Sequence, residues 1–283
     1  MVDGTIVVAG EALVDLVPGD GDVLAAHLGG GPFNVARAVG RSGGAVAYLG
    51  RLSTDHFGTR LRAALAGDGV DLSLAVSTPD PTTLALASVD EHGAASYAFY
   101  VEGTSAPGLQ SAPDAVSRAR VLCVGTLGLL YDPTASTLEA LVLSAPRKQV
   151  IAVDPNIRPA AIPDERAYRA RLGRIFTRAD IVKASSDDLS WLAPGAAPAD
   201  AMRTLLAPGA TGFVTLGSDG ALIIPPSGEV THIPAPPVDI IDTIGAGDAF
   251  MGALLTHDLS NPTVATEAAV AAASAACTIA GAG

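Results

Sequence analysis

Short apolar segments alternate with longer helical patterns along most of the chain, and no other feature of the sequence restricts the fold as much. Segments such as "TIVVAG" (5–10) and "RVLCVGT" (120–126) are largely apolar at successive positions. Such runs are typical of parallel strands that helices cover on both faces. Strands and helices that alternate along a chain favour an α/β fold with an open, mostly parallel sheet.

The alternation also predicts where the elements lie. Strands are expected at 5–10, 45–50, 120–126, 150–156, 180–185 and 213–217. Helices are expected at 33–42, 56–67, 134–144, 164–176, 199–206, 247–257 and 262–279. The sequence has no internal repeat and no low-complexity linker, so we expect one α/β domain over residues 1–283.

Two segments interrupt this rhythm. Residues 11–28 hold two apolar stretches around a "PGDGD" turn, and residues 83–101 hold two alternating stretches around "DEHG". Each pattern indicates a β-hairpin. We expect the hairpins to pair in space as a small β-sheet lid built from about residues 11–30 and 75–106. The alternative is two unrelated surface hairpins.

Composition limits the partners of the chain. Its net charge is −12, and an acidic surface repels nucleic acid and anionic lipid. No run of apolar residues is long enough to span a membrane. The first residues, "MVDGTIVVAGEAL", lack a basic leader, so we expect a cytoplasmic protein. Cys123 and Cys277 lie far apart in the sequence, which favours buried thiols over a disulfide or a metal site.

The stretch "DTIGAGDAFMGALL" places one acid, Asp248, behind three very small residues at the start of an apolar helical run. Gly245, Ala246 and Gly247 would let a large anion approach the free N–H groups of a helix N-terminus. Asp248 could then act as a base that accepts a proton from a hydroxyl group. The alternative is a strand-to-helix turn with Asp248 as a capping acid. The stretch is neither a Rossmann fingerprint nor a P-loop.

A second glycine cluster, "LGGGPFNVARAVGRSGG" (28–44), precedes another helical pattern. Its glycines would let a polyhydroxy ligand lie against bare backbone. Asn34 offers both a donor and an acceptor, which sugar hydroxyls require. Asp15 lies between apolar positions of the first hairpin, and a carboxylate there needs a specific partner. Either a sugar hydroxyl or a structural hydrogen bond would satisfy the polar atoms of each of these two residues.

Polar residues follow three further strand patterns. "VDPNIRP" (153–159) ends a strand with Asn156 and Arg158, "KASSDDLSWL" (183–192) offers Ser185 and Asp188, and "VTLGSDGALII" (214–224) turns tightly. Ligands of open α/β sheets bind beyond the carboxyl ends of strands, so these residues are candidates for one site. Each segment alone is also compatible with an ordinary turn.

Taken in this order, the segments resemble the ribokinase-like, or pfkB-type, carbohydrate kinases. "DTIGAGDAF" is similar to the C-terminal signature of that family, and "GGGPFNVARAVGRSGG" with "YLGRLSTDHFG" is similar to the N-terminal one. "GEALVDLVP", "VDPNIRP", "VKASSDDLSWL" and "VTLGSDGA" resemble the fructokinase and 2-keto-3-deoxygluconate kinase branch. The resemblance runs from Thr5 to the end of the sequence. It implies a three-layer α/β/α fold with a small β-sheet lid over the sugar.

The resemblance also implies roles for individual residues. Asp248 would be the catalytic base, and Gly245, Ala246 and Gly247 would form the anion hole. The substrate-binding residues would be Asp15, Gly30, Gly31, Asn34, Phe99, Asn156 and Arg158. The ATP-binding residues would be Lys183, Ser185, Thr215, Leu216, Gly217, Ser218 and Gly220. Asp188 would act on Mg²⁺ through water, and Asp242 with the Ile244 carbonyl would hold a monovalent cation such as K⁺.

The sequence departs from the family pattern in places. Fructokinase-like members usually have an arginine near Val101 or Glu102, and this chain has none there, which weakens the assignment of fructose. Ser185 and Asp188 stand where the family usually has the Asn and Glu of an N-x-x-E motif. Relatives usually continue beyond the position of Gly283, so part of the cation site and of the adenine pocket would lie beyond it.

The expected function is therefore an ATP-dependent sugar kinase that phosphorylates a primary hydroxyl of a small sugar. Fructose is the leading acceptor, followed by 2-keto-3-deoxygluconate and ribose-like sugars or nucleosides. The alternative from another class is a non-catalytic sugar-binding regulator on the same scaffold. The expected cofactors are ATP, Mg²⁺ and K⁺. The partners would be the sugar and a second copy of the chain docked through the lid, without nucleic acid or membrane.

Overall fold

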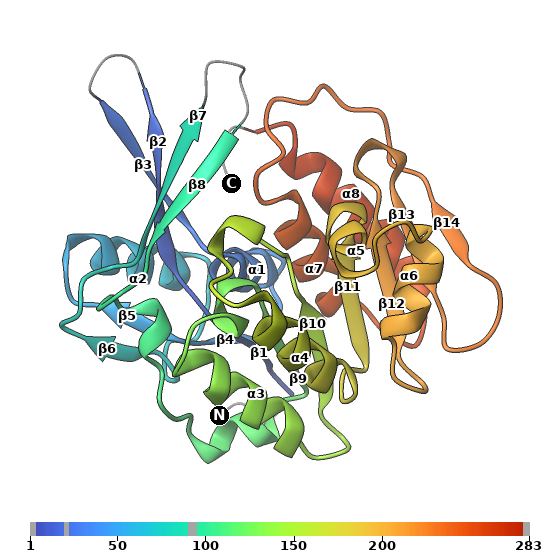
Figure 1. Cartoon of the computed structure of the whole chain (residues 1–283), viewed down its shortest axis with the longest axis horizontal. Coiled ribbons are helices and arrows are strands. Elements are labelled where there is room, and N and C mark those ends of the chain that lie inside the picture. The colour runs from blue at the N-terminus through green and yellow to red at the C-terminus, as the bar shows by residue number, and fades with distance from the viewer. Residues whose placement is uncertain (1–3, 20–22, 90–94, 280–283) are drawn as a thin grey trace.

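The computed structural model describes residues 4–19, 23–89 and 95–279 (Figure 1). Within them, an eight-stranded central sheet is parallel from β4 to β12, and β13 and β14 are added to it antiparallel. In spatial order its strands are β14 (Thr231–Ile233), β13 (Ala221–Ile224), β12 (Thr211–Thr215), β11 (Ile181–Ser185), β10 (Val150–Asp154), β9 (Val121–Gly125), β1 (Ile6–Ala9) and β4 (Val46–Leu49).

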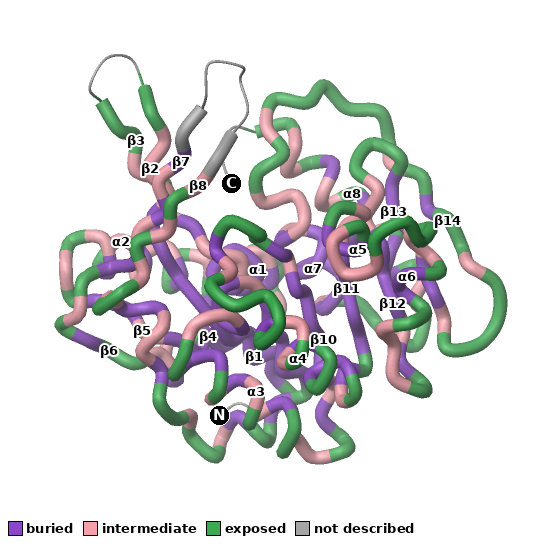
Figure 2. The backbone as a smooth tube through the Cα atoms, viewed as in Figure 1, coloured by how far each residue is buried: buried purple, intermediate pink, exposed green. Residues whose placement is uncertain are grey.

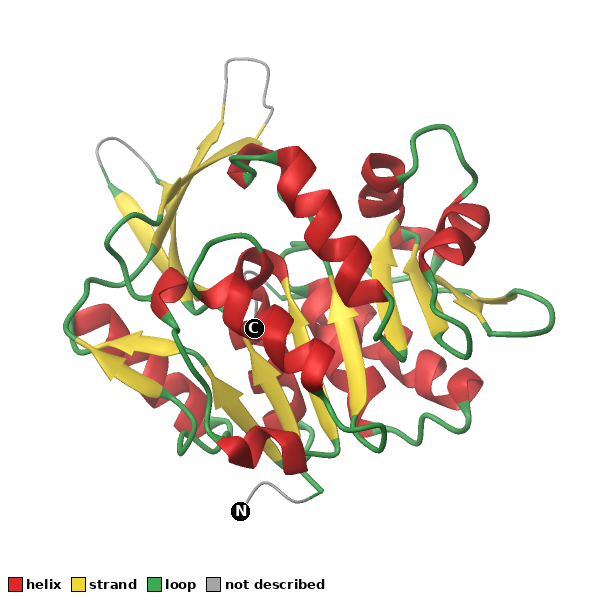
Figure 3. Cartoon of the chain, turned by 60° about the horizontal axis from the view of Figure 1, so that its bottom comes forward, coloured by secondary structure: helices red, strands yellow, loops and turns green. Residues whose placement is uncertain are grey.

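Helices cover both faces of this sheet (Figure 3). One face packs against α3 (Thr134–Ser144), α4 (Glu165–Phe176), α5 (Ser186–Leu192) and α6 (Pro198–Leu205). The other face packs against α1 (Gly31–Arg41), α2 (His56–Gly67), α7 (Ala246–Thr256) and α8 (Pro262–Ala276). None of the described helices combines the length and the apolar character that a bilayer span needs.

Strand β1 shows why the pattern of apolar runs predicted this architecture. Val7 and Ala9 pack into the core cluster on one face, and Ile6 and Val8 pack into the cluster on the other. A strand that is buried on both faces must be apolar at successive positions, which is what the sequence shows. The predicted three-layer α/β/α fold is confirmed. Figure 2 shows that the central strands are buried along most of their length.

The two hairpin patterns form one smaller sheet, which we call the lid sheet. Its order is β3 (Leu24–Gly29), β2 (Leu13–Pro18), β7 (Leu84–Val89) and β8 (Ala95–Tyr100). β2 pairs parallel with β7, so segments far apart in the sequence meet in space. In Figure 1 this sheet projects beyond the edge of the central layers. Most of the two predicted turns, "PGDGD" and "DEHG", lies outside the described residues.

The structure adds elements that the sequence pattern did not predict, among them β14 at the edge of the central sheet. Helix α5 follows β11 directly, and a separate two-stranded sheet pairs β5 (Arg51–Ser53) with β6 (Val76–Thr78). β6 lies inside the range that we expected for the lid, but its partner is β5. Helix α1 begins at Gly31, two residues before the predicted start, because Pro32 in the first turn already has the φ angle of a helix.

Candidate active site

A cavity of about 950 Å³ lies where the carboxyl ends of the parallel strands face the lid sheet. The residues after β1, β9, β10, β11 and β12 line it, together with the lid strands, the start of α7 and one face of α8. The predicted site residues in its lining are Asp15, Gly30, Gly31, Asn34, Phe99, Asn156, Arg158, Lys183, Ser185, Thr215, Leu216, Gly217, Gly220, Asp242, Ile244, Gly245, Ala246, Gly247 and Asp248. Ser218 and Asp188 do not line it.

The start of α7 presents free N–H groups to this cavity. Gly245 caps the helix in the left-handed region, with φ at 80°, a conformation that glycine adopts without strain. The helical hydrogen bonds begin with the N–H of Ala249, which donates to the Gly245 carbonyl over 2.8 Å. In the described part of the chain, the N–H groups of Gly247 and Asp248 have no acceptor. A helix N-terminus of this kind binds anions such as phosphate.

Asp248 lies in the first turn of α7 and is only 8% exposed. Its Oδ2 accepts a hydrogen bond from Nδ2 of Asn34 over 2.9 Å, while Oδ1 has no partner among the described residues. Burial raises the pKa of Asp248 to about 7, although the Asn34 hydrogen bond acts in the opposite direction. The carboxyl group can therefore exchange a proton near neutral pH, as a general base must.

Close packing of α1 against α7 brings Asn34 to Asp248. A Cβ added at Gly252 of α7 would lie 2.6 Å from the Cβ of Ala38 in α1, so the two helices touch at backbone distance there. The hydrogen bond thus joins the two glycine-rich segments of the sequence. The Oδ1 atom of Asn34 is buried without a partner among the described residues, and a ligand hydroxyl could satisfy it.

Lys183 places a positive charge beside the start of α7. Its Nζ donates to Oδ2 of Asp154 over 2.9 Å, and a Cβ at Gly247 would lie 2.9 Å from the same nitrogen. Burial alone would lower the pKa of Lys183, but the Asp154 carboxylate raises it above its ordinary value. The ammonium group therefore stays charged at the edge of the cavity, where it can contact an anion.

Glu11 is a residue that our sequence reasoning missed. It is 1% exposed and follows β1 in the cavity wall. Its carboxylate accepts the N–H of Gly31 over 3.1 Å and the N–H of Gly128 over 2.8 Å. Burial raises its pKa to about 8 against the effect of these bonds. The sequence signal for Glu11 is an acid directly after a predicted buried strand.

The lid side of the cavity is polar and aromatic. Asp15 on β2 lies opposite His27 on β3, and burial raises the pKa of Asp15 to about 6. Tyr97 and Phe99 stack on β8 with their ring centres 6.2 Å apart. Across the cavity, the Arg158 guanidinium donates to backbone carbonyls over 3.2 Å and pairs with no carboxylate in the described residues. This mixture of rings and hydrogen-bonding groups suits a sugar.

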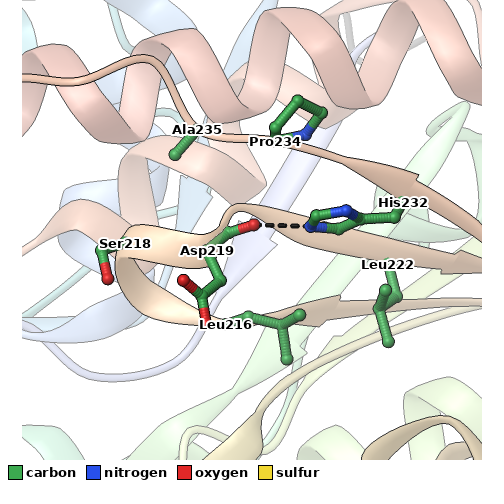
Figure 4. A pocket seen from close by; sticks show the side chains of 7 residues that line it. All are labelled: Leu216, Ser218, Asp219, Leu222, His232, Pro234 and Ala235. Carbon is green, nitrogen blue, oxygen red and sulfur yellow. Dashed lines mark hydrogen bonds between the residues drawn. The ribbon is translucent and has the colours of Figure 1, made fainter.

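The predicted nucleotide turn is divided between two cavities. Thr215, Gly217 and Gly220 line the large one, whereas Ser218 lines a separate cavity of about 530 Å³ that His232 and Asp219 also line (Figure 4). A ring nitrogen of His232 lies 2.6 Å from the Asp219 carbonyl oxygen. Leu216 and Ala235 line both cavities, so the two adjoin at this turn, with Ser218 on the side of the smaller one.

Asp188 has structural partners instead of an open side. Its Oδ1 accepts the N–H of Ile157 over 2.6 Å, and its Oδ2 accepts the N–H and the hydroxyl of Ser185 over 2.8 and 2.7 Å. Ser185 and Asp188 together form the capping box of α5. Three hydrogen bonds therefore occupy most of the roughly four lone-pair positions of this carboxylate.

Asp242 and Ile244 lie together in the loop before α7. The N–H of Ile244 donates to Oδ1 of Asp242 over 2.9 Å, which closes a tight turn. Among the described residues, no group of three or more His, Cys, Asp or Glu side chains could hold a metal ion.

Comparisons with known proteins identify the family of this chain. Residues 5–283 match the pfkB family of carbohydrate kinases. A fructokinase from Rhizobium leguminosarum bv. trifolii is 36% identical over 257 residues, which are 88% of this chain and 78% of that protein.

Solved structures share the fold over nearly the whole chain. The crystal structure of a fructokinase with bound ATP from Xylella fastidiosa has a TM-score of 0.89 at 28% identity, covering 99% of this chain and 94% of that one. A double-mutant fructokinase from Vibrio cholerae O395, with fructose, ADP and a potassium ion bound, has a TM-score of 0.85 at 27% identity and the same coverage. The chain therefore belongs to the pfkB family of carbohydrate kinases and is a sugar kinase.

Proposed function

We propose that this enzyme is an ATP-dependent fructokinase, which transfers the γ-phosphate of ATP to a primary hydroxyl of fructose. One observation carries the proposal: within the described residues, a buried carboxylate with one unpartnered oxygen lies in the same cavity as N–H groups that have no acceptor. The fructokinases among its relatives, described with ATP or with fructose and ADP, supply the substrates of the proposal.

In the proposed reaction, Oδ1 of Asp248 accepts the proton of the fructose hydroxyl as that oxygen attacks the γ-phosphorus. The bond between the γ-phosphorus and the oxygen that bridges to the β-phosphate breaks, and ADP leaves. The N–H groups of Gly247 and Asp248 and the ammonium of Lys183 lie where they can stabilise the negative charge of the transferring group. Asn34 holds Oδ2 and so directs Oδ1 toward the acceptor.

ATP would enter from the side of α8 and the turn after β12. Leu216 and Gly217 after β12 line the cavity, as do Val270 and Ala273 of α8. The sugar would occupy the other end, between Asp15 and Asn156. Closure of the lid sheet over it would exclude water, which otherwise competes as a phosphate acceptor.

Metal ions enter this proposal mainly through the nucleotide. Mg²⁺ bound by the ATP phosphates neutralises charge on the transferring group, and a single carboxylate such as Asp188 would act on it only through water. K⁺ would lie at Asp242 and the Ile244 carbonyl, in the loop that leads into α7. That position would support the backbone of the anion hole.

The lid sheet also suggests a homodimer. β3 and β8 are the edge strands of this sheet, and Leu24 and Tyr100 on them are 49% and 55% exposed. Unpaired edges with exposed apolar side chains favour association with another chain. Light scattering of the purified protein would decide between a monomer and this dimer.

A coupled assay of ADP release tests the proposed function directly. The panel contains fructose, 2-keto-3-deoxygluconate, ribose and a nucleoside, with ATP and Mg²⁺, and a reaction without acceptor as the control. We expect the highest kcat/KM with fructose and a product that is one phosphate group heavier by mass spectrometry. If none of the four acceptors is turned over above the control, the proposed fructokinase activity is wrong.

One observation favours a second acceptor. Arg158 lines the cavity without a carboxylate partner in the described residues, and the carboxylate of 2-keto-3-deoxygluconate could supply one. The panel separates the two acceptors. A kcat/KM for 2-keto-3-deoxygluconate above that for fructose would change the assignment of the acceptor but not the reaction.

A further inference from the structure

Two residues with left-handed backbone lie side by side in the cavity wall. Thr126 has φ at 52° and Asn156 has φ at 39°, and these are the positive-φ residues other than glycine in the described part of the chain. They follow β9 and β10, which are neighbours in the central sheet with Gly125 opposite Asp154 (Figure 1). The left-handed region is tolerable for Asn but strained for a β-branched residue such as Thr.

The surrounding structure holds Thr126 in this conformation. It begins a short 3₁₀ helix, Thr126–Leu129, whose Gly128 N–H is fixed by the buried carboxylate of Glu11. The other oxygen of Glu11 holds the N–H of Gly31 at the start of α1. Glycine at position 126 would remove the strain, so the side chain that the chain retains there requires another explanation.

Both side chains turn polar atoms toward the same part of the cavity. A Cβ added at Gly31 would overlap the hydroxyl of Thr126 and would lie 3.4 Å from Nδ2 of Asn156. Neither side chain has a hydrogen-bond partner within the described residues, although both line the cavity. A threonine hydroxyl and an asparagine amide each donate and accept, so together they match two adjacent hydroxyl groups.

We propose that Thr126 and Asn156 contact two adjacent hydroxyls of the acceptor sugar, and that Thr126 is a specificity-determining residue of this enzyme. The proposal rests on the proposed sugar kinase function and assigns Thr126 a role that the sequence motifs do not give it. The absence of a side chain at Gly31 leaves the space that the hydroxyl of Thr126 occupies beside Asn156. Strain at Thr126 is then the consequence of aiming a hydroxyl at the substrate.

Three variants of Thr126 separate the hydroxyl from the backbone. Thr126→Val keeps the branched shape and removes the hydroxyl, Thr126→Ser keeps the hydroxyl, and Thr126→Gly removes both the hydroxyl and the strain. We expect Thr126→Val to lose about tenfold in kcat/KM for the sugar with an unchanged KM for ATP. Thr126→Ser should stay within about threefold of the wild type. Thr126→Gly should lose activity while its melting temperature stays the same or rises.

A series of deoxy sugars provides the decisive readout. For the wild type, kcat/KM should be lower with a deoxy sugar that lacks the contacted hydroxyl than with the full sugar. The factor should equal the loss in kcat/KM that Thr126→Val causes with the full sugar. With Thr126→Val, that one analogue should show no further loss, whereas the other analogues should. Asn156→Gly, which can keep the left-handed backbone, should give the same pattern with the analogue that lacks the neighbouring hydroxyl. This variant tests the proposal if Thr126→Val does not fold.

The outcomes distinguish this proposal from the proposed function. If the wild type phosphorylates a sugar and Thr126→Val loses nothing, or loses the same factor with every analogue, the contact proposed here is wrong and the kinase assignment stands. If the wild type phosphorylates no sugar, both proposals are overturned. A loss confined to the KM for ATP would also contradict the contact with the acceptor.

Discussion

Burial decides what the carboxylates of this cavity do. Asp248, Asp15 and Glu11 all have raised pKa values, to about 7, 6 and 8, because their surroundings exclude water. Their hydrogen bonds then divide them. Both oxygens of Glu11 are held by backbone N–H groups, whereas Oδ1 of Asp248 faces the cavity without a partner in the described residues. Asp248 is the carboxylate that is placed to accept a proton from a substrate.

The pKa of Asp248 predicts an acid limb in the pH profile. The base must be ionised, and its pKa of about 7 means that the ionised fraction falls as pH drops through 7. We therefore expect kcat/KM for the sugar to decrease about tenfold per pH unit below that value. Initial rates between pH 5 and 9 check this. A profile that stays flat from pH 7 down to pH 5 would contradict the raised pKa.

Asn34→Ala should move that limb. Loss of the hydrogen bond to Oδ2 removes an interaction that lowers the pKa of Asp248, so the limb should shift to higher pH. We also expect kcat to fall, because without this hydrogen bond Oδ1 of Asp248 is no longer held toward the acceptor. Asn261→Ala, which removes the side-chain cap of α8, is the control. It should cost about 1 kcal/mol of unfolding free energy without a shift of the limb, and a shift there would assign the effect to stability.

At single residues, the sequence predicted chemistry better than conformation. The types and neighbours of Asp248 and Asn34 predicted a base and a sugar contact, the family resemblance predicted Lys183 as an ATP-binding residue, and all three line the large cavity. The sequence could not show that Thr126 has a positive φ, because that depends on contacts with distant residues such as Glu11. The sequence also could not show which cavity Ser218 lines, because the backbone conformation of the short 3₁₀ turn Gly217–Asp219 decides where that side chain points.

Among the elements, the contact between α1 and α7 matters most for the site. The two helices approach at Gly252, and this approach sets the hydrogen bond between Asn34 and Asp248. A larger residue at Gly252 must push the helices apart. The same packing buries Phe33 and Phe250 in one core cluster, so stability and catalysis share this interface.

Gly252→Ala tests that connection. The new Cβ would lie 2.6 Å from Cβ of Ala38, so we expect a loss of about 1–3 kcal/mol in unfolding free energy. We also expect kcat to fall, because the separation moves Asn34 away from Asp248. Gly173→Ala in α4 is the matched control. A Cβ there meets nothing within 4 Å, so the change should leave kcat unaltered and stabilise by about 0.5–1 kcal/mol.

Urea denaturation and steady-state kinetics on both variants distinguish the outcomes. A Gly252→Ala variant with wild-type kcat would show that the helix contact does not position the base.

Most elements were predictable because their periodicity is strong. The alternation of apolar runs with helical patterns located the six parallel strands and seven of the helices within a few residues. Helix α5 was missed because seven residues are too few to show a period, and β5 and β6 because three residues are. The hairpin patterns suggested that β2 and β7 share a sheet but could not fix their pairing, since nothing local in either hairpin records its distant partner.

On the scale of the whole molecule, the site exists only because separate layers meet. The central sheet contributes Lys183 and Asn156, one helical layer contributes Asn34 and Asp248, and the lid sheet contributes Asp15. Ligands that contact all three layers should therefore raise the free energy of unfolding of the whole domain. The acidic surface, with a net charge of −12, leaves the recognition of an anionic nucleotide to local groups such as Lys183 and the start of α7.

Ligand-dependent melting tests this arrangement. Fructose alone, or a non-hydrolysable ATP analogue with Mg²⁺ alone, should each raise the free energy of unfolding by about 2.7 kcal/mol at 100 times its own dissociation constant. We expect the pair to raise the melting temperature more than the two separate shifts combined, because they occupy one cavity between the same layers. A sugar alcohol that is not phosphorylated is the control. Strictly additive shifts would indicate that the two ligands do not share the cavity.

The most direct test of the account is phosphate transfer by Asp248→Asn. This variant keeps the shape of the side chain and removes the base. We expect the variant to keep a melting temperature within about 3 °C of the wild type, while kcat for fructose falls about 10²–10⁴-fold. Phosphorylation at the wild-type rate by a folded Asp248→Asn protein would contradict the role of Asp248 and with it the proposed mechanism.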